Sequence, residues 1–261
     1  MGHIRYEMRD RIAHVIIDRP EKRNAMTFAM LKDFNRTVME AGQDASIGAL
    51  IIEGTGGAWC AGTDLSDLNN TPEDERSTAG KAAEAEPTAP WPIVACPRPV
   101  IGAIDGPAMG MGAEFATQCD VRIASTRAKF GWVFVLRGLV SDTGAGSFLL
   151  PRIIGPTSAM RLLFSGETID AQEALALGFV SAVVEPDDLP AAAEDEAKRY
   201  LSASPFAVGR MKQLVYGAMA NPLDAHLRDT AKLLNECFHS EDHAEGVAAF
   251  LERRPSKFTG R

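Results

Sequence analysis

The chain has 261 residues, 46% of them hydrophobic and 24% charged, a balance that suits a globular protein large enough to bury a sizeable core. Its net charge of −8 argues against nucleic acid as a main partner, because a phosphate backbone requires a basic face. Four scattered cysteines, no signal-like N-terminus and no apolar run of membrane length exclude a disulfide scaffold and a membrane span, so we expect a cytoplasmic protein.

The first half of the chain alternates strand-like and helix-like segments. Short apolar runs rich in β-branched residues predict buried strands, and they cover residues 12–17, 49–54, 99–106 and 119–125. Residues 26–41 place apolar side chains at helical intervals, with Thr27 suited to cap the helix. Residues 66–92 are polar with several prolines and predict a loop. This alternation is typical of an α/β fold.

The second half of the chain is mainly helical after residue 144. From Pro190 onward the sequence predicts helices only, with short apolar stripes that need a partner, either the main domain or another subunit. We therefore divide the chain into an α/β core over residues 1–190 and a helical region over residues 191–261.

Two loops, residues 56–65 and 106–115, share one design: a buried strand, a turn rich in Gly and Ala, and a helix start made of small residues. A helix N-terminus offers unpaired N–H groups and a partial positive charge. Two such amides directed at one point would form an oxyanion hole for a carbonyl that gains negative charge. Neither loop matches the G-x-G-x-x-G dinucleotide fingerprint with its later acidic residue.

At these loops the sequence resembles the crotonase (enoyl-CoA hydratase/isomerase) superfamily. AWCAGTDL and GPAMGMGAEFATQCDVRIAS are similar to its two signatures, and RPEKRNAM and RRPSKFTGR also fit, so the similarity spans nearly the whole chain. The resemblance implies a spiral of repeated ββα units with a C-terminal helical region that packs subunits into homotrimers or dimers of trimers. It also implies an acyl-CoA thioester substrate, with CoA as part of that substrate and no separate cofactor or metal.

The resemblance further assigns site residues by position. The backbone N–H groups of Cys60 and Met111 should form the oxyanion hole, although family members often have glycine where this chain has Met111. Residues expected to meet CoA are Lys22, Arg23 and Ala25 at the nucleotide, and Ala58, Ala61 and Asp64 along the adenine and pantetheine path.

The carboxylates separate two possible reactions. Typical hydratases of this family use two glutamates; Glu114 matches the first, but Phe134 stands at the second position and cannot move a proton. Asp142 resembles instead the acid/base of crotonase-fold enoyl-CoA isomerases, including ring isomerases of the phenylacetate pathway. We expect an enoyl-CoA isomerase with Asp142 as base and Glu114 as second carboxylate, and keep a 2-enoyl-CoA hydratase as the alternative.

Simpler interpretations stand beside these. Asp142 could cap the helix predicted to follow it, and Glu114 could balance a helix N-terminus. The substitution of Phe134 leaves open a catalytically silent acyl-CoA binding protein. An RNA-binding relative would need a lysine-rich helical face, but residues 26–41 offer only Lys32 and Arg36.

Overall fold

The computed structural model describes residues 2–70 and 91–261 and contains two β-sheets. The larger sheet has the order β1-β2-β3-β4-β6-β9; its first two strands are antiparallel and all its other neighbours are parallel. The smaller sheet has the order β5-β7-β8. The strands are β1 (His3–Arg9), β2 (Ile12–Asp18), β3 (Ala49–Gly54), β4 (Val100–Ile104), β5 (Pro107–Met109), β6 (Val121–Ser125), β7 (Lys129–Gly131), β8 (Ile169–Asp170) and β9 (Ala182–Val184).

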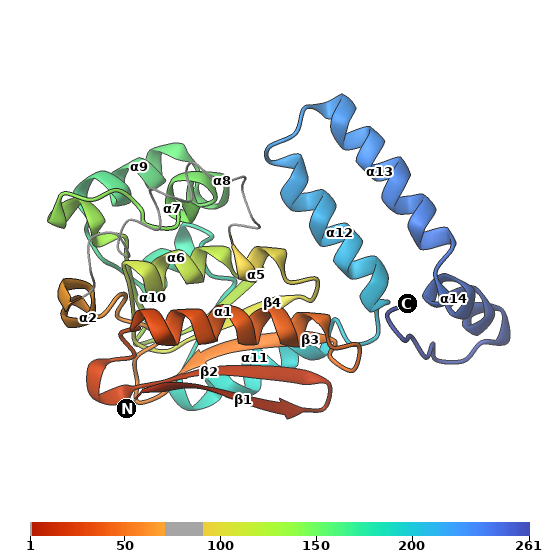
Figure 1. Ribbon diagram of the computed structural model, residues 1–261, viewed down its shortest axis with the longest axis horizontal. Helices are drawn as coiled ribbons and strands as arrows, with labels where there is room; N and C mark the ends of the chain where they lie inside the picture. The colour runs from red at the N-terminus through yellow and green to blue at the C-terminus, as the bar shows by residue number, and fades with distance from the viewer. Residues whose placement is uncertain (1, 71–90) are drawn as a thin grey trace.

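Helices cover both faces of the larger sheet, with α1 on one side and α11 on the other (Figure 1). The helices are α1 (Phe28–Gln43), α2 (Leu65–Asn70), α5 (Pro92–Ala95), α6 (Met111–Gln118), α7 (Ala145–Phe148), α8 (Leu150–Ile154), α9 (Pro156–Ser165), α10 (Ala171–Ala176), α11 (Leu189–Lys198), α12 (Pro205–Ala218), α13 (Leu223–Phe238) and α14 (Glu241–Glu252). Short 3₁₀ turns are η1 (Pro20–Lys22), η2 (Val133–Arg137) and η3 (Pro186–Asp188). Of these described helices, none has the length and apolar character needed to cross a bilayer.

The alternating direction of strand side chains explains the two cores. In β2, Ala13, Val15 and Ile17 join the core beneath α1, whereas Ile12 joins a second core beneath α11. A strand buried on both faces has a nearly continuous apolar sequence, and here the exception is His14, which is buried and hydrogen-bonded to Glu53. This is why residues 12–17 signal a strand so clearly.

The structure confirms the predicted helix and the four predicted strands near their expected positions, and Thr27 caps α1 by accepting a 3.2 Å hydrogen bond from Met30 N–H. It also contains two strands of the larger sheet that the sequence analysis missed: the short strand β9, and the edge strand β1, whose Ile4, Tyr6 and Met8 alternate with polar residues although most of its side chains are exposed. The prediction of a loop over 66–92 is wrong at its ends, where α2 and α5 are helical; residues 71–90 lie outside the described part.

The predicted boundary between residues 190 and 191 falls inside α11, whose apolar stripe packs on the sheet through Leu189, Ala193 and Ala197. For this helix the partner is therefore the main domain. Helices α12, α13 and α14 follow it and extend to one side of the α/β body (Figure 1).

A buried arginine anchors the C-terminal end of α6, the helix that follows the second glycine-rich loop. Arg122 is 8% exposed and donates hydrogen bonds to the carbonyl oxygens of Ala116, Cys119 and Phe179. Its guanidinium also lies over the Phe179 ring, 5.0 Å from the centroid. A cation at this end of a helix satisfies carbonyls that have no partner within the helix.

Phe34 connects α1 to α6 through the core, since its ring stacks on Phe115 with centroids 4.9 Å apart and is fully buried. We expect Phe34→Ala to lower the free energy of unfolding by about 3–5 kcal/mol, because it leaves a cavity in this contact. Urea denaturation checks the value, with Lys32→Ala on the exposed face of the same helix as control. An equal, small loss in both variants would contradict this packing.

Candidate active site

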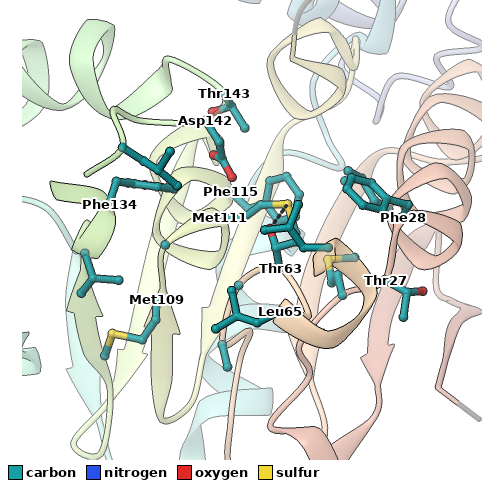
Figure 2. A pocket seen from close by; sticks show the side chains of 18 of the residues that line it. Thr27, Phe28, Thr63, Leu65, Met109, Met111, Phe115, Phe134, Asp142 and Thr143 are labelled. Atoms are coloured by element: carbon teal, nitrogen blue, oxygen red, sulfur yellow. Dashed lines mark hydrogen bonds between the residues drawn. The ribbon is translucent and has the colours of Figure 1, made fainter. Parts of the chain in front are cut away.

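A cavity of about 760 Å³ opens between α1, the loop after β3, the N-terminal end of α6 and the segment that runs from η2 to Thr143 (Figure 2). Most of its lining is apolar, with Phe28, Met111, Phe115 and Phe134 among the contributors. A large apolar cavity with a few polar groups is the usual form of a small-molecule site. Residues of both glycine-rich loops line this cavity, which is therefore the candidate active site.

Glycine is required where the two loops touch. A Cβ on Gly112 would lie only 2.1 Å from the Cys60 carbonyl oxygen, so any side chain here would push the loops apart. Gly110 adopts a φ of 54°, which L-residues rarely take. The next residue, Met111, begins α6 with ordinary backbone angles and tolerates a side chain where the family often has glycine.

The first loop uses most of its amides for structure. Cys60 N–H donates to the Pro107 carbonyl (3.0 Å) in a parallel bridge, and Ala61 N–H donates to the Arg23 carbonyl (3.0 Å). Cys60 also lies outside the cavity lining, and burial raises the pKa of its thiol to about 12. The prediction that the Cys60 N–H contributes to an oxyanion hole is therefore wrong, because that N–H already has a carbonyl partner.

Thr63 supplies the amide that Cys60 cannot. Met26 and Thr63 face each other in a parallel bridge. Its two hydrogen bonds run from Met26 N–H to the Gly62 carbonyl and from Asp64 N–H to the Met26 carbonyl, so the Thr63 N–H points away from Met26. Within the described residues this N–H has no hydrogen-bond acceptor, and Thr63 lines the cavity.

The Met111 N–H is the second free amide. It stands at the first position of α6, where helix geometry provides no acceptor, and none is found elsewhere in the described chain. Thr63 and Met111 are neighbours, since the Thr63 hydroxyl lies 3.8 Å from the Met111 sulfur (Figure 2). A Cβ on Gly62, the residue before Thr63, would lie 3.5 Å from Met111 N. Two unpaired amides at one point of the cavity are the arrangement that stabilises a developing oxyanion.

Asp142 is the sole carboxylate among the described residues of the cavity lining. Its side chain is exposed and faces the cavity (Figure 2). Partial desolvation beside the cavity wall, reinforced by the charge of Glu114, raises the pKa of Asp142 from 3.8 to about 6. It does not cap the following helix: α7 begins after Gly144, without a side-chain cap.

Glu114 is fully buried on α6 and lies behind the cavity wall instead of lining it. Its carboxylate accepts hydrogen bonds from the Thr143 hydroxyl (2.6 Å) and from Gly146 N–H (2.9 and 3.0 Å). Burial raises the pKa of Glu114, and these hydrogen bonds oppose that shift. Glu114 lies close enough to Asp142 for its charge to raise the pKa of Asp142, but of the two predicted carboxylates only Asp142 lines the cavity.

The residues predicted to meet CoA divide into two groups. Arg23 and Ala61 line the cavity, with Lys22 and Ala25 next to Arg23 in the chain, so this set stays a prediction that the geometry permits.

The other two residues lie outside the cavity lining. Ala58 is 3% exposed and its carbonyl accepts from Asn24 (2.6 Å). The Asp64 carboxylate is paired with Arg19 at 2.7 Å and accepts from Ser66 N–H at the start of α2. Their bonds hold the loop in shape, and the structure does not bring them to the cavity.

Sequence reasoning missed Thr63, Thr143 and Gly146. Thr143 and Gly146 follow Asp142 closely in the chain, but only the tertiary structure shows that they bind Glu114. No sequence pattern marks the Thr63 amide. The register of the bridges between this loop and other segments decides which of its amides has no hydrogen-bond partner.

Comparisons with known proteins agree with this geometry. The family model "Enoyl-CoA hydratase/isomerase" matches residues 7–261. The chain is 36% identical to a probable enoyl-CoA hydratase of Rhodobacter capsulatus, over 99% of this chain and 98% of that protein. It is 34% identical to the 1,2-epoxyphenylacetyl-CoA isomerase of Escherichia coli, over 94% of each chain.

Among solved structures, an enoyl-CoA hydratase from Bacillus anthracis superposes with a TM-score of 0.89 at 28% identity, covering 99% of this chain and all of that one. The α/β architecture and its helical extension are thus those of the crotonase fold. With a family model spanning nearly all of its length and relatives above 30% identity, the chain belongs to the enoyl-CoA hydratase/isomerase family.

Proposed function

We propose that the protein is an enoyl-CoA isomerase that shifts a double bond in an acyl-CoA thioester, with Asp142 as the proton-transfer group. The observation that carries this proposal is that Asp142 alone among the described acidic residues lines the cavity. Its raised pKa, about 6, suits a group that must both take and return a proton near neutral pH. The isomerase name of one relative agrees with this choice.

The reaction follows from the groups in the cavity. The thioester oxygen accepts from the amides of Thr63 and Met111, which stabilise the enolate and so acidify the adjacent C–H. Asp142 removes the proton from carbon 2 of a 3-enoyl group, and the electron pair delocalises into the carbonyl. The protonated Asp142 then delivers the proton to carbon 4, and the conjugated 2-enoyl thioester forms. No atom is gained or lost, so the reaction needs no cofactor beyond the CoA of its substrate.

Hydration of a 2-enoyl-CoA is the second candidate, and the buried Glu114 favours it. A carboxylate held by Thr143 and Gly146 could take part in positioning a water, and several relatives are named as hydratases. Against it stands Phe134, which occupies the place of the second glutamate and lines the cavity. A phenyl ring can neither hold nor relay a proton.

A substrate pair separates the two reactions. We expect purified protein to increase the conjugated-thioester absorbance of 3-hexenoyl-CoA, because the product is a 2-enoyl thioester. The matched variant Glu114→Gln should retain most of this activity, since glutamine still accepts from Gly146. Loss of absorbance from 2-hexenoyl-CoA, eliminated by Glu114→Gln and unaffected by Asp142→Asn, would instead identify a hydratase.

Assembly into a homotrimer or a dimer of trimers is part of the proposal. Its support is the set of large apolar side chains exposed on the C-terminal helices α13 and α14, which comprises Leu223, Leu227, Leu234, Phe238, Val247, Phe250 and Leu251. Exposed apolar side chains gathered on adjoining helices mark a surface that associates with protein.

A further inference from the structure

We infer that the acyl pocket selects a substrate whose acyl chain carries a hydroxyl group, and that Gln118 recognises this group. The inference rests on the acyl-CoA function proposed above and extends it to the substrate class. Gln118 ends α6, lines the cavity and is 1% exposed. Its side-chain oxygen has no hydrogen-bond partner in the described chain.

The hydrogen bonds of Thr143 fix how the Gln118 amide is turned. The Thr143 hydroxyl has a single hydrogen, which it donates to Glu114 (2.6 Å). Its oxygen accepts from Ala145 N–H (3.2 Å) and from the Gln118 NH₂ group (3.4 Å). Because the hydroxyl hydrogen is already used in this way, a reversed amide would bring two acceptor oxygens together. The Gln118 NH₂ group therefore faces Thr143, and its oxygen has to find a donor elsewhere.

A buried acceptor without a partner is unfavourable, and polar groups in protein interiors are almost always paired. The cavity is the open space beside Gln118, so a bound molecule can supply the missing donor. Asn35, on α1, lines the same cavity, and its side chain has no hydrogen bond among the described residues. A hydroxyl group is a neutral hydrogen-bond donor, so it can donate to the Gln118 oxygen.

The chemistry of these side chains favours an uncharged donor. Both are neutral amides. Of the two carboxylates at this site, Glu114 already accepts from Thr143 and Gly146, and Asp142 is assigned to proton transfer at the reacting carbons. Gln118 is seven residues after Met111, about 10 Å along the helix. The hydroxyl must therefore lie several bonds beyond the thioester carbonyl that Met111 holds.

Matched acyl-CoA pairs test the inference by calorimetry at pH 8. The pairs are 6-hydroxyhexanoyl-CoA against hexanoyl-CoA, and 8-hydroxyoctanoyl-CoA against octanoyl-CoA. We expect about tenfold or greater preference for the hydroxylated member of at least one pair, because only that member satisfies Gln118. Gln118→Met removes the acceptor at similar size and should reduce the preference to below about twofold. The control is Gln172→Met, at an exposed position of α10, and thermal melting confirms folding of both variants.

Three results would overturn the inference. Equal affinities for the two members of both pairs would show that the pocket does not recognise a hydroxyl group, and the proposed acyl-CoA function would remain. A preference that survives in Gln118→Met would assign recognition to another residue. Failure of all four acyl-CoAs to bind would remove the proposed function itself, and this inference with it.

Discussion

Asp142→Asn is expected to lower kcat for double-bond migration by about 10³-fold, within the range that a positioned general base contributes. Asparagine has nearly the same shape but cannot take a proton, so substrate binding should change little. The assay is the absorbance gain from 3-hexenoyl-CoA, with Asp195→Asn as a matched control because that side chain is 76% exposed on α11. A loss below tenfold would mean that Asp142 is not the base.

The pH dependence of the wild-type enzyme should report the same group. Asp142 acts as a base only when ionised, and its pKa is raised to about 6. We therefore expect kcat/KM to fall about tenfold per pH unit below 6 and to level off above it. A profile without an inflection between pH 5 and 7 would contradict this assignment.

Stability should move in the opposite direction. The folded protein holds the Asp142 proton more tightly than the unfolded chain does, because the pKa rises from 3.8 to about 6. Ionisation therefore lowers the stability of the folded state as the pH rises through this window, and the loss persists above it. Asp142→Asn should consequently melt at a higher temperature than wild type at pH 7, and the difference should vanish near pH 3.

Met111→Pro is the second substitution with a large expected effect, because it deletes one oxyanion N–H. Proline is tolerated at the first position of a helix, which Met111 occupies in α6. Removing one such donor costs about 10²–10³ in kcat, or about 3 kcal/mol. We expect a loss of this size with the 3-enoyl substrate, measured with thermal melting in parallel.

Two controls separate the amide from other effects of that substitution. Met111→Ala keeps the N–H and loses only the side chain, so its kcat should stay within about tenfold of wild type. Glu241→Pro places proline at the first position of α14, far from the cavity, and should leave turnover unchanged. Equal losses in Met111→Ala and Met111→Pro would show that the side chain matters and the amide does not.

The sequence predicted α1 and the four inner strands of the larger sheet, because buried parallel strands form apolar runs and amphipathic helices have a clear period. It missed the two outer strands: β9 has only three residues, and β1 is an exposed edge strand whose alternation of Ile4, Tyr6 and Met8 was overlooked. Asp142 and Met111 could be placed through the family motifs. Thr63 could not, since the free amide was displaced by three residues from the expected Cys60.

The distinct environments of the two carboxylates also lay beyond the sequence. Asp142 and Glu114 carry the same functional group, and no local pattern indicates that one meets the cavity while the other is enclosed. That difference arises from Thr143 and Gly146, which fold back over α6 and hold Glu114 from behind. Long-range contacts of this kind decide pKa values and hence roles.

The anchoring of α6 by Arg122 has a consequence for the reaction's energy. The guanidinium fixes the carbonyls at one end of this helix, and the Met111 N–H projects from the other. In the proposed reaction negative charge appears on the thioester oxygen, and the dipole that receives it is already oriented, whereas water would first have to reorient. The dipole is therefore oriented when the protein folds, and the charge-forming step needs little further reorganisation energy. Arg122 contributes to this without contacting any reacting atom.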